Sequence, residues 1–216
     1  MAEITWLGHS CFRLRGREAT IITDPYNKRL GYDFGRPRAD IVTSSRPGEF
    51  YRFFEAIKGE PKVVEGPGEY EINDVFITGI GTYADAENGK KRGKNTAYIF
   101  DLEGMQICHL GAIGHTLSEE QLEQMSNVDV LLVPVGGNTT INARQASEVI
   151  SAIEPHIVIP MHYKLDNLDV DLDELSNFAK EMGLTTITPQ EKFTLKSSDL
   201  PEGTKIIVLG LQKQAV

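Results

Sequence analysis

The fold of this chain is organised around residues 40–51, which read DIVTSSRPGEFY. Residues 40–44 predict a short buried strand, because Ile41, Val42 and Thr43 are apolar or β-branched. The pattern breaks at residues 45–48, and a helix is expected to begin at Glu49. The functional prediction depends on this loop, because a strand that ends in a loop before a helix is where α/β proteins place their chemistry.

The segments on either side alternate between strand and helix patterns. Apolar residues recur at i, i+3, i+4 and i+7 after Glu49, which predicts a helix over residues 49–58. Capping boxes at Ser118 and Asn142 predict two further helices, and a fourth is expected over residues 172–182. Strands are expected at 4–7, 12–14, 20–23, 62–64, 75–78, 96–102, 105–110, 128–135, 157–159, 185–188, 192–196 and 205–209. This order predicts an α/β (α+β) fold of two sheets packed face to face with helices outside, as one domain over residues 1–216.

The composition excludes some classes of partner. The chain has 216 residues, 40% of them hydrophobic and 25% charged, and a net charge of -9. Nucleic acid and anionic membranes require a basic surface, so we expect neither as the main partner. No apolar run approaches the length of a membrane span, and the N-terminus lacks a signal-peptide pattern. Cys11 and Cys108 lie in apolar runs, which favours buried free thiols in a reducing cytoplasm.

Four segments together resemble one family. They read LGHSCF at 7–12, TDP at 23–25, LLVPVGG at 131–137 and IPMHY at 159–163. In this order they resemble the small single-domain, Zn-dependent hydrolases of the metallo-β-lactamase fold, over nearly the whole chain. The resemblance implies a four-layer α/β/β/α sandwich with two metals held by loops along one edge. It also implies a possible homo-oligomer, since members of this subgroup often associate.

The metal-ligand positions of that family carry other residues here. The H-x-H-x-D-H motif, a later histidine and a bridging aspartate fall on Arg46, Gly48, Phe50, Tyr51, Ala84 and Ala112. Only His162 is retained, and no histidine stands between His9 and His109. Zinc sites need about three or four N, S or O ligands. The resemblance therefore implies a degenerate member, and we expect it to bind no metal cofactor.

His162 and His115 are the candidate catalytic residues. His162 either exchanges a proton in a remnant pocket or is held by a backbone carbonyl. His115 follows Gly114 and either faces the same pocket or plays no part in it. His9 is expected to make a structural hydrogen bond and His109 to be a satisfied core histidine, and Asp24 is expected to accept N–H groups from the loop at 45–48.

The predicted ligand-binding residues are Arg46, Tyr51 and His162. Arg46 forms, with the cations at 90–94, either the mouth of an anion site or a solvated loop. Ser45 and His162 resemble a nucleophile and base, but no third group is placed to orient them. A metal held by new ligands is a further alternative; its candidate ligands are Glu49, Asp85, His115 and His162.

Three functions from different classes remain open. The first is a pseudoenzyme that binds an unknown small molecule or protein in the former metal cleft. The second is a hydrolase with a metal-dependent or remodelled site, although a chain without metal lacks a Lewis acid and an activated hydroxide. The third is a structural subunit of an oligomer.

Overall fold

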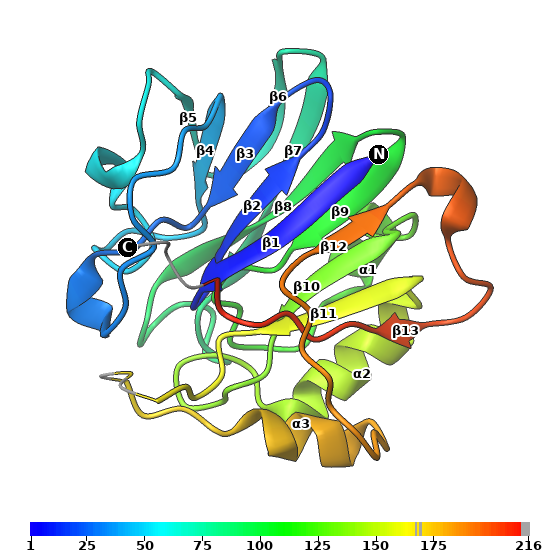
Figure 1. Ribbon diagram of the computed structural model, residues 1–216. Helices are drawn as coiled ribbons and strands as arrows, with labels where there is room; N and C mark the ends of the chain where they lie inside the picture. The colour runs from blue at the N-terminus through cyan, green and yellow to red at the C-terminus, as the bar shows by residue number, and fades with distance from the viewer. Residues whose placement is uncertain (167, 169, 213–216) are drawn as a thin grey trace.

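The computed structural model describes residues 1–166, 168 and 170–212, and their strands form two sheets (Figure 1). The first sheet has the order β12 (Phe193–Leu195), β1 (Ala2–Gly8), β2 (Cys11–Arg15), β3 (Thr20–Thr23), β4 (Ile41–Ser44), β5 (Lys62–Glu65). The second has the order β13 (Lys205–Ile206), β11 (Ile157–Met161), β10 (Val130–Pro134), β9 (Met105–His109), β8 (Lys94–Leu102), β7 (Val75–Tyr83), β6 (Gly68–Ile72). Strands β3 to β5 are mutually parallel, and so are β9, β10, β11 and β13.

The predicted face-to-face packing of two sheets is confirmed. Successive side chains of a strand point to opposite faces. Ile21 and Ile41 face the interior and join one core cluster with Tyr98 and Ile107 of the second sheet. Ile22 and its neighbours on the other face belong to a separate outer cluster. The sandwich core therefore lies between the sheets.

Helices cover the outer face of the second sheet. In Figure 1, α2 (Ala143–Ile153) and α3 (Leu175–Glu181) lie together beside β10 and β11. The capping boxes at Asn142 and Ser118 are both formed, and the latter starts α1 (Glu119–Gln124). The helix expected over 172–182 is shorter than predicted.

The helix expected over residues 49–58 is wrong. Among the described residues of this segment only a 3-10 turn, η2 (Phe54–Ala56), is helical. The backbone N–H groups bond elsewhere: Phe53 N–H donates to the Pro25 carbonyl at 2.7 Å and Lys58 N–H to the Pro37 carbonyl at 2.8 Å. The helical spacing of the phenylalanines reflects burial in the outer cluster, which the loop achieves without a helix.

The outer layer on the first sheet consequently consists of loops. The segments 24–40 and 45–61 cover this face, and in the described residues their helical content is η1 (Lys28–Leu30) and η2. Figure 1 shows the cyan turn η2 beside β5 and the blue turn η1 lower on the same side of the view. The sandwich is that of the predicted fold class, with a helical layer on one side and a loop layer on the other.

The strand expected over residues 185–188 is also wrong. Residues 184–189 lie outside strands, and residues 185–189 are exposed. Leu184 N–H donates to the Ala179 carbonyl at the end of α3. The chain closes through β12, the 3-10 turn η3 (Ser197–Asp199) and β13. Across the described residues, no helix has the length and apolar character needed to cross a membrane.

Candidate functional site

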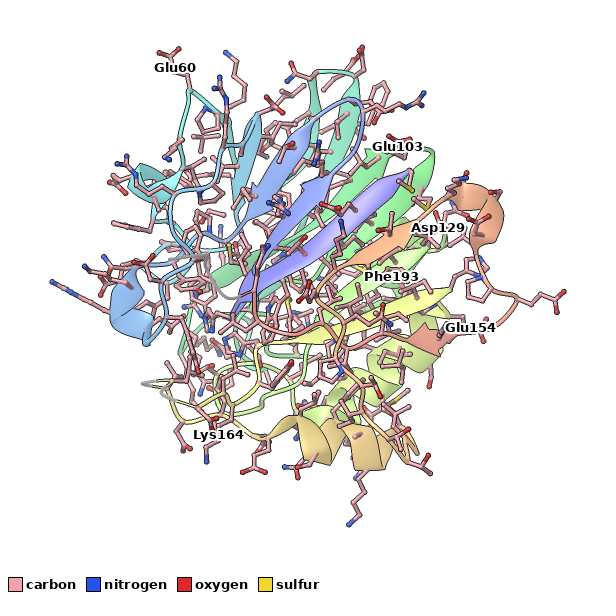
Figure 2. The ribbon with its side chains drawn as sticks, in the orientation of Figure 1. Glu60, Glu103, Asp129, Glu154, Lys164 and Phe193 are labelled. Atoms are coloured by element: carbon pink, nitrogen blue, oxygen red, sulfur yellow. The ribbon has the colours of Figure 1, made fainter. Side chains whose placement is uncertain are left out.

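The carboxyl ends of the parallel strands meet at one edge of the sandwich. Figure 2 shows Asp129 and Glu154, which precede β10 and β11, on the opposite side of the molecule. At the site edge, His162 N–H donates to the His9 carbonyl at 3.1 Å, and Thr96 N–H donates to the Ser45 carbonyl at 2.8 Å. These bonds join the two sheets directly beneath the loop that begins at Ser45.

One part of this edge is a paired polar cluster, the Asp24 network, which consists of Asp24, Ser45 and Asn95. Asp24 accepts the Ser45 N–H at 2.6 Å and the Ser45 hydroxyl at 2.7 Å, which confirms its predicted role in holding the loop. Burial raises the pKa of the Asp24 carboxyl to about 7, although the bonds from Ser45 oppose that rise. Asn95 accepts the Ala112 N–H at 2.8 Å and donates to Thr82 and to the Leu110 carbonyl.

Two histidines beside the network have structural contacts. His109 is fully buried, and its Nε2 lies 2.8 Å from the Ser10 carbonyl, whereas Nδ1 has no partner among the described residues, so the expectation of a satisfied core histidine is met at one nitrogen only. Burial lowers its pKa to about 4, so the imidazole is neutral near pH 7. His115 accepts the Tyr83 N–H at Nε2 and bonds the Thr116 carbonyl through Nδ1. Both nitrogens of this candidate catalytic residue are therefore committed to the backbone.

The other part of the edge is an aromatic and cationic cluster, the Tyr51 plug, which consists of Arg46, Tyr51, His162 and His9. The Tyr51 hydroxyl lies 3.3 Å from His162 Nε2, and the Arg46 guanidinium stands 5.4 Å from the Tyr51 ring centroid. The structure thus brings together the three predicted ligand-binding residues. It places the buried Tyr51 ring, instead of an open cleft, against His162.

His9 completes the plug by ring contact. Its ring centroid is 4.1 Å from that of His162 and 5.2 Å from that of Tyr51. The predicted structural hydrogen bonding of His9 runs through its backbone carbonyl, which accepts from Trp6 Nε1 and from His162 N–H, whereas neither ring nitrogen has a partner among the described residues. Burial lowers the pKa of His162 to about 4 and that of His9 well below its usual value, so both rings are neutral near pH 7.

Three residues of this edge have a strained backbone. His9, Asp24 and His162 have φ values of 53°, 40° and 54°, in the left-handed region that non-glycine residues rarely adopt. Such strain costs on the order of 1–3 kcal/mol for each residue and is typical of functional sites.

The other positions that carry metal ligands in the family differ in burial here. Gly48 is exposed, and its carbonyl accepts the Tyr51 N–H at 3.0 Å in the turn that directs Tyr51 inward. Phe50 is half-buried against the outer cluster. Ala84 and Ala112 are fully buried.

The loop at 84–94 is held by Asp85, an anchoring role that the sequence analysis did not predict. The Asp85 carboxylate accepts N–H groups of Glu87, Gly89, Lys91 and Arg92 at 2.6–3.1 Å. The Arg92 carbonyl in turn accepts a bond from Arg46 at 2.6 Å. An aspartate ahead of a glycine-punctuated loop was the available signal.

The donors at these positions do not fit a zinc ion bound in the family's manner. Arg46 is a permanent cation that repels a divalent ion, and Gly48, Phe50, Ala84 and Ala112 offer no side-chain donor. Within the residues that the structure describes, no three His, Cys, Asp or Glu side chains are grouped to hold an ion. In the alternative set, Glu49 pairs with Arg29, and Asp85 and His115 bond the backbone.

A two-sheet α/β sandwich with its polar loops at one edge defines a metallo-β-lactamase-type fold. The chain belongs to the beta-lactamase superfamily, because the model of the beta-lactamase superfamily domain matches residues 3–162.

Relatives span nearly the same length. A candidate Zn-dependent hydrolase of the metallo-β-lactamase superfamily from Thermotoga maritima is similar in structure, with a TM-score of 0.80 and 34% identity over 97% of this chain and 99% of that one. A Thermoplasma acidophilum protein named UPF0173 metal-dependent hydrolase is 27% identical over 87% of this chain and 95% of its own. A Pyrococcus abyssi protein of the same name is 30% identical over 76% and 85%.

Proposed function

We propose that this chain is a non-catalytic member of its hydrolase family, a pseudoenzyme that acts by binding a ligand or a protein. The observation that carries the proposal is the contact of Tyr51 with both His162 and Arg46, at positions where the family resemblance implies metal ligands. A guanidinium and a buried phenol ring supply positive charge and bulk where a divalent ion requires negative or neutral donors and space.

The chemistry left in the plug favours binding over hydrolysis. Burial raises the pKa of the Tyr51 hydroxyl far above neutrality, and His162 has lost its affinity for a proton through burial first and the nearby Arg46 second. Neither group supplies a base matched to neutral pH. Arg46 remains able to form charge-assisted hydrogen bonds with a carboxylate or phosphate.

Metal-dependent hydrolysis is the second candidate, favoured by the names of the relatives. It requires the Tyr51 plug to rearrange and new donors to join His162.

The buried thiols of Cys11 and Cys108 support a cytoplasmic setting, and a homo-oligomer remains a prediction.

The test is the metal content of the purified protein after expression with added zinc, manganese or iron. We expect well below one equivalent per chain by mass spectrometry, and no chelator-sensitive esterase, phosphodiesterase or lactamase activity. The control is His162→Ala, which should leave this low metal content unchanged. About one metal per chain that is lost in the variant contradicts the proposal.

A further inference from the structure

A cavity of about 310 Å³ opens in the loop layer on the outer face of the first sheet. Its walls are the segments 26–36 and 53–56, which meet where the predicted helix is replaced by loop. The two segments are fastened to each other, because Asn27 N–H donates to the Glu49 carbonyl at 2.8 Å and Phe53 N–H to the Pro25 carbonyl at 2.7 Å. The cavity is therefore preformed, and its volume lies at the lower end of the range for small-molecule sites.

The floor of the cavity is apolar. Tyr26 and Phe34 are buried with ring centroids 4.8 Å apart, and Phe53 and Ala56 complete the lining. The Tyr26 hydroxyl donates to the Leu7 carbonyl at 2.6 Å, so Tyr26 offers the cavity its ring and no free hydroxyl. Such a floor favours a flat or branched apolar group.

The rim of the cavity is charged, with two cations left free. Lys28 and Arg36 are exposed, and neither forms an ion pair with a described residue. Of the two rim carboxylates, Asp33 already accepts the Gly35 N–H at 2.8 Å. Glu55 lies near Arg52. The pKa of Arg52 is raised mainly by its hydrogen bond to Glu65, and the charge of Glu55 raises it further.

We propose that this cavity binds a small amphipathic monocarboxylate, with its apolar body on the Tyr26–Phe34 floor and its carboxylate at Arg36 and Lys28. A guanidinium matches the geometry of a carboxylate in a bidentate pair. The site is distinct from the Tyr51 plug and does not depend on the metal content of the protein. The Tyr26 ring, whose centroid is 6.4 Å from that of His9, lies between the two.

The experiment is calorimetric titration of the whole chain at low salt with three probes of one shape: 3-phenylpropionate, 3-phenylpropylamine and 3-phenylpropionamide. We expect the carboxylate to bind at least about tenfold more tightly than the amine or the amide, consistent with the worth of charged hydrogen bonds. Backbone amide shifts on titration should be concentrated at Gly35 and Ala56.

Matched variants assign the contacts. Arg36→Glu and Lys28→Glu should each weaken carboxylate binding by about tenfold or more, whereas Lys180→Glu, an exposed cation on α3, should not change it. Ala56→Phe should fill the cavity and abolish binding, with circular dichroism confirming that the variant is folded. If Ala56→Phe does not fold, the amide shifts and the two charge reversals decide the question.

Three results would overturn the proposal. Tighter binding of the amine assigns the cavity to cations through Asp33 and Glu55. Equal affinity for all three probes leaves the rim cations without a role. No binding of the carboxylate up to its solubility limit removes the site altogether.

Discussion

The Asp24 network and the Tyr51 plug adjoin each other at the end of β4, yet they are held together in different ways. Every side-chain polar atom of Asp24, Ser45 and Asn95 has a hydrogen-bond partner, at 2.6–3.0 Å. In the plug, both ring nitrogens of His9, Nδ1 of His162 and Nε of Arg46 are buried without a partner among the described residues. The network is held by hydrogen bonds and the plug by packed rings.

This difference between the network and the plug explains how the loop at 45–51 keeps its position although its residues depart from the family's ligand pattern. Its first residue is fixed by Asp24 from behind, through bonds that do not involve residues 46–51. The side chains beyond Ser45 are then free to vary, provided that they fill the space beside His162. Each prediction below tests one side of this comparison.

The largest loss of unfolding free energy should come from Gly111→Ala, which places a methyl group against Ser45 and Asn95 of the Asp24 network. Gly111 has φ +62°, and a Cβ there would lie 2.4 Å from Ser45 Cβ and 2.7 Å from Asn95 Oδ1. The left-handed backbone costs about 1–2 kcal/mol for alanine, and the collision should raise the loss of unfolding free energy to about 3–5 kcal/mol. Urea denaturation measures it.

The matched control is Gly104→Ala. Gly104 has a similar φ of +71°, but a Cβ there meets nothing within 4 Å. Only the backbone cost of about 1–2 kcal/mol is expected. Equal losses of unfolding free energy in the two variants would show that the Asp24 network shifts to accommodate a methyl group. That result would contradict a rigid support.

The second-largest effect should be the change in unfolding free energy with pH that is due to Asp24. The pKa of Asp24 rises from 3.8 to about 7 on folding because of burial, so the native state binds its proton more tightly than the unfolded state. Stability from this group is therefore lost as pH rises between these values, by about 1.4 kcal/mol per pH unit. Denaturation at pH 5 and pH 7 should differ by about 2–3 kcal/mol more in the wild type than in Asp24→Asn.

Asp24→Asn isolates this effect because the pH dependence contributed by the neighbouring groups is common to both proteins and cancels in the comparison. His109, 4.0 Å away, has a pKa of about 4, and burial raises the pKa of Cys11 well above neutrality. The asparagine carbonyl retains an acceptor for the Ser45 N–H. Parallel pH profiles for the two proteins would mean that Asp24 is ionised throughout, and that the network is a charged support instead of a protonated one.

Much of the fold was predictable because its signals are local. Capping boxes at Ser118 and Asn142 depend on residues three positions apart, and the strand at 40–44 on its β-branched side chains. The helix over 49–58 failed for the opposite reason. Phe53 and Lys58 bond the carbonyls of Pro25 and Pro37, and nothing within the segment shows those distant partners.

The site was predictable in part. The family resemblance placed Arg46, Tyr51 and His162 at metal-ligand positions of one site, and residues that follow parallel strands do meet at one edge. Sequence could not show that the Tyr51 ring would fill the predicted cleft, since the outcome depends on the turn at Gly48 and the space beside His9. The unpaired nitrogens of His9 likewise arise from tertiary packing alone.

The smallest effect should come from Tyr51→Phe, which tests the plug. The ring stays in place, and the variant loses only the hydroxyl 3.3 Å from His162 Nε2. Because packed rings hold the plug, we expect a loss of about 0.5–1.5 kcal/mol, the usual worth of one hydrogen bond. Tyr51→Ala, which removes the ring, should cost about 3–5 kcal/mol.

The ratio of these two losses measures how the plug is held. Tyr26→Phe is the control for the hydroxyl, since it removes a bond of 2.6 Å to the Leu7 carbonyl within the same layer. We expect it to cost at least as much as Tyr51→Phe, because its bond is shorter and leaves a buried carbonyl unpaired. If Tyr51→Phe costs nearly as much as Tyr51→Ala, the hydroxyl and not the ring anchors the loop. The plug would then be a hydrogen-bonded support of the same kind as the Asp24 network.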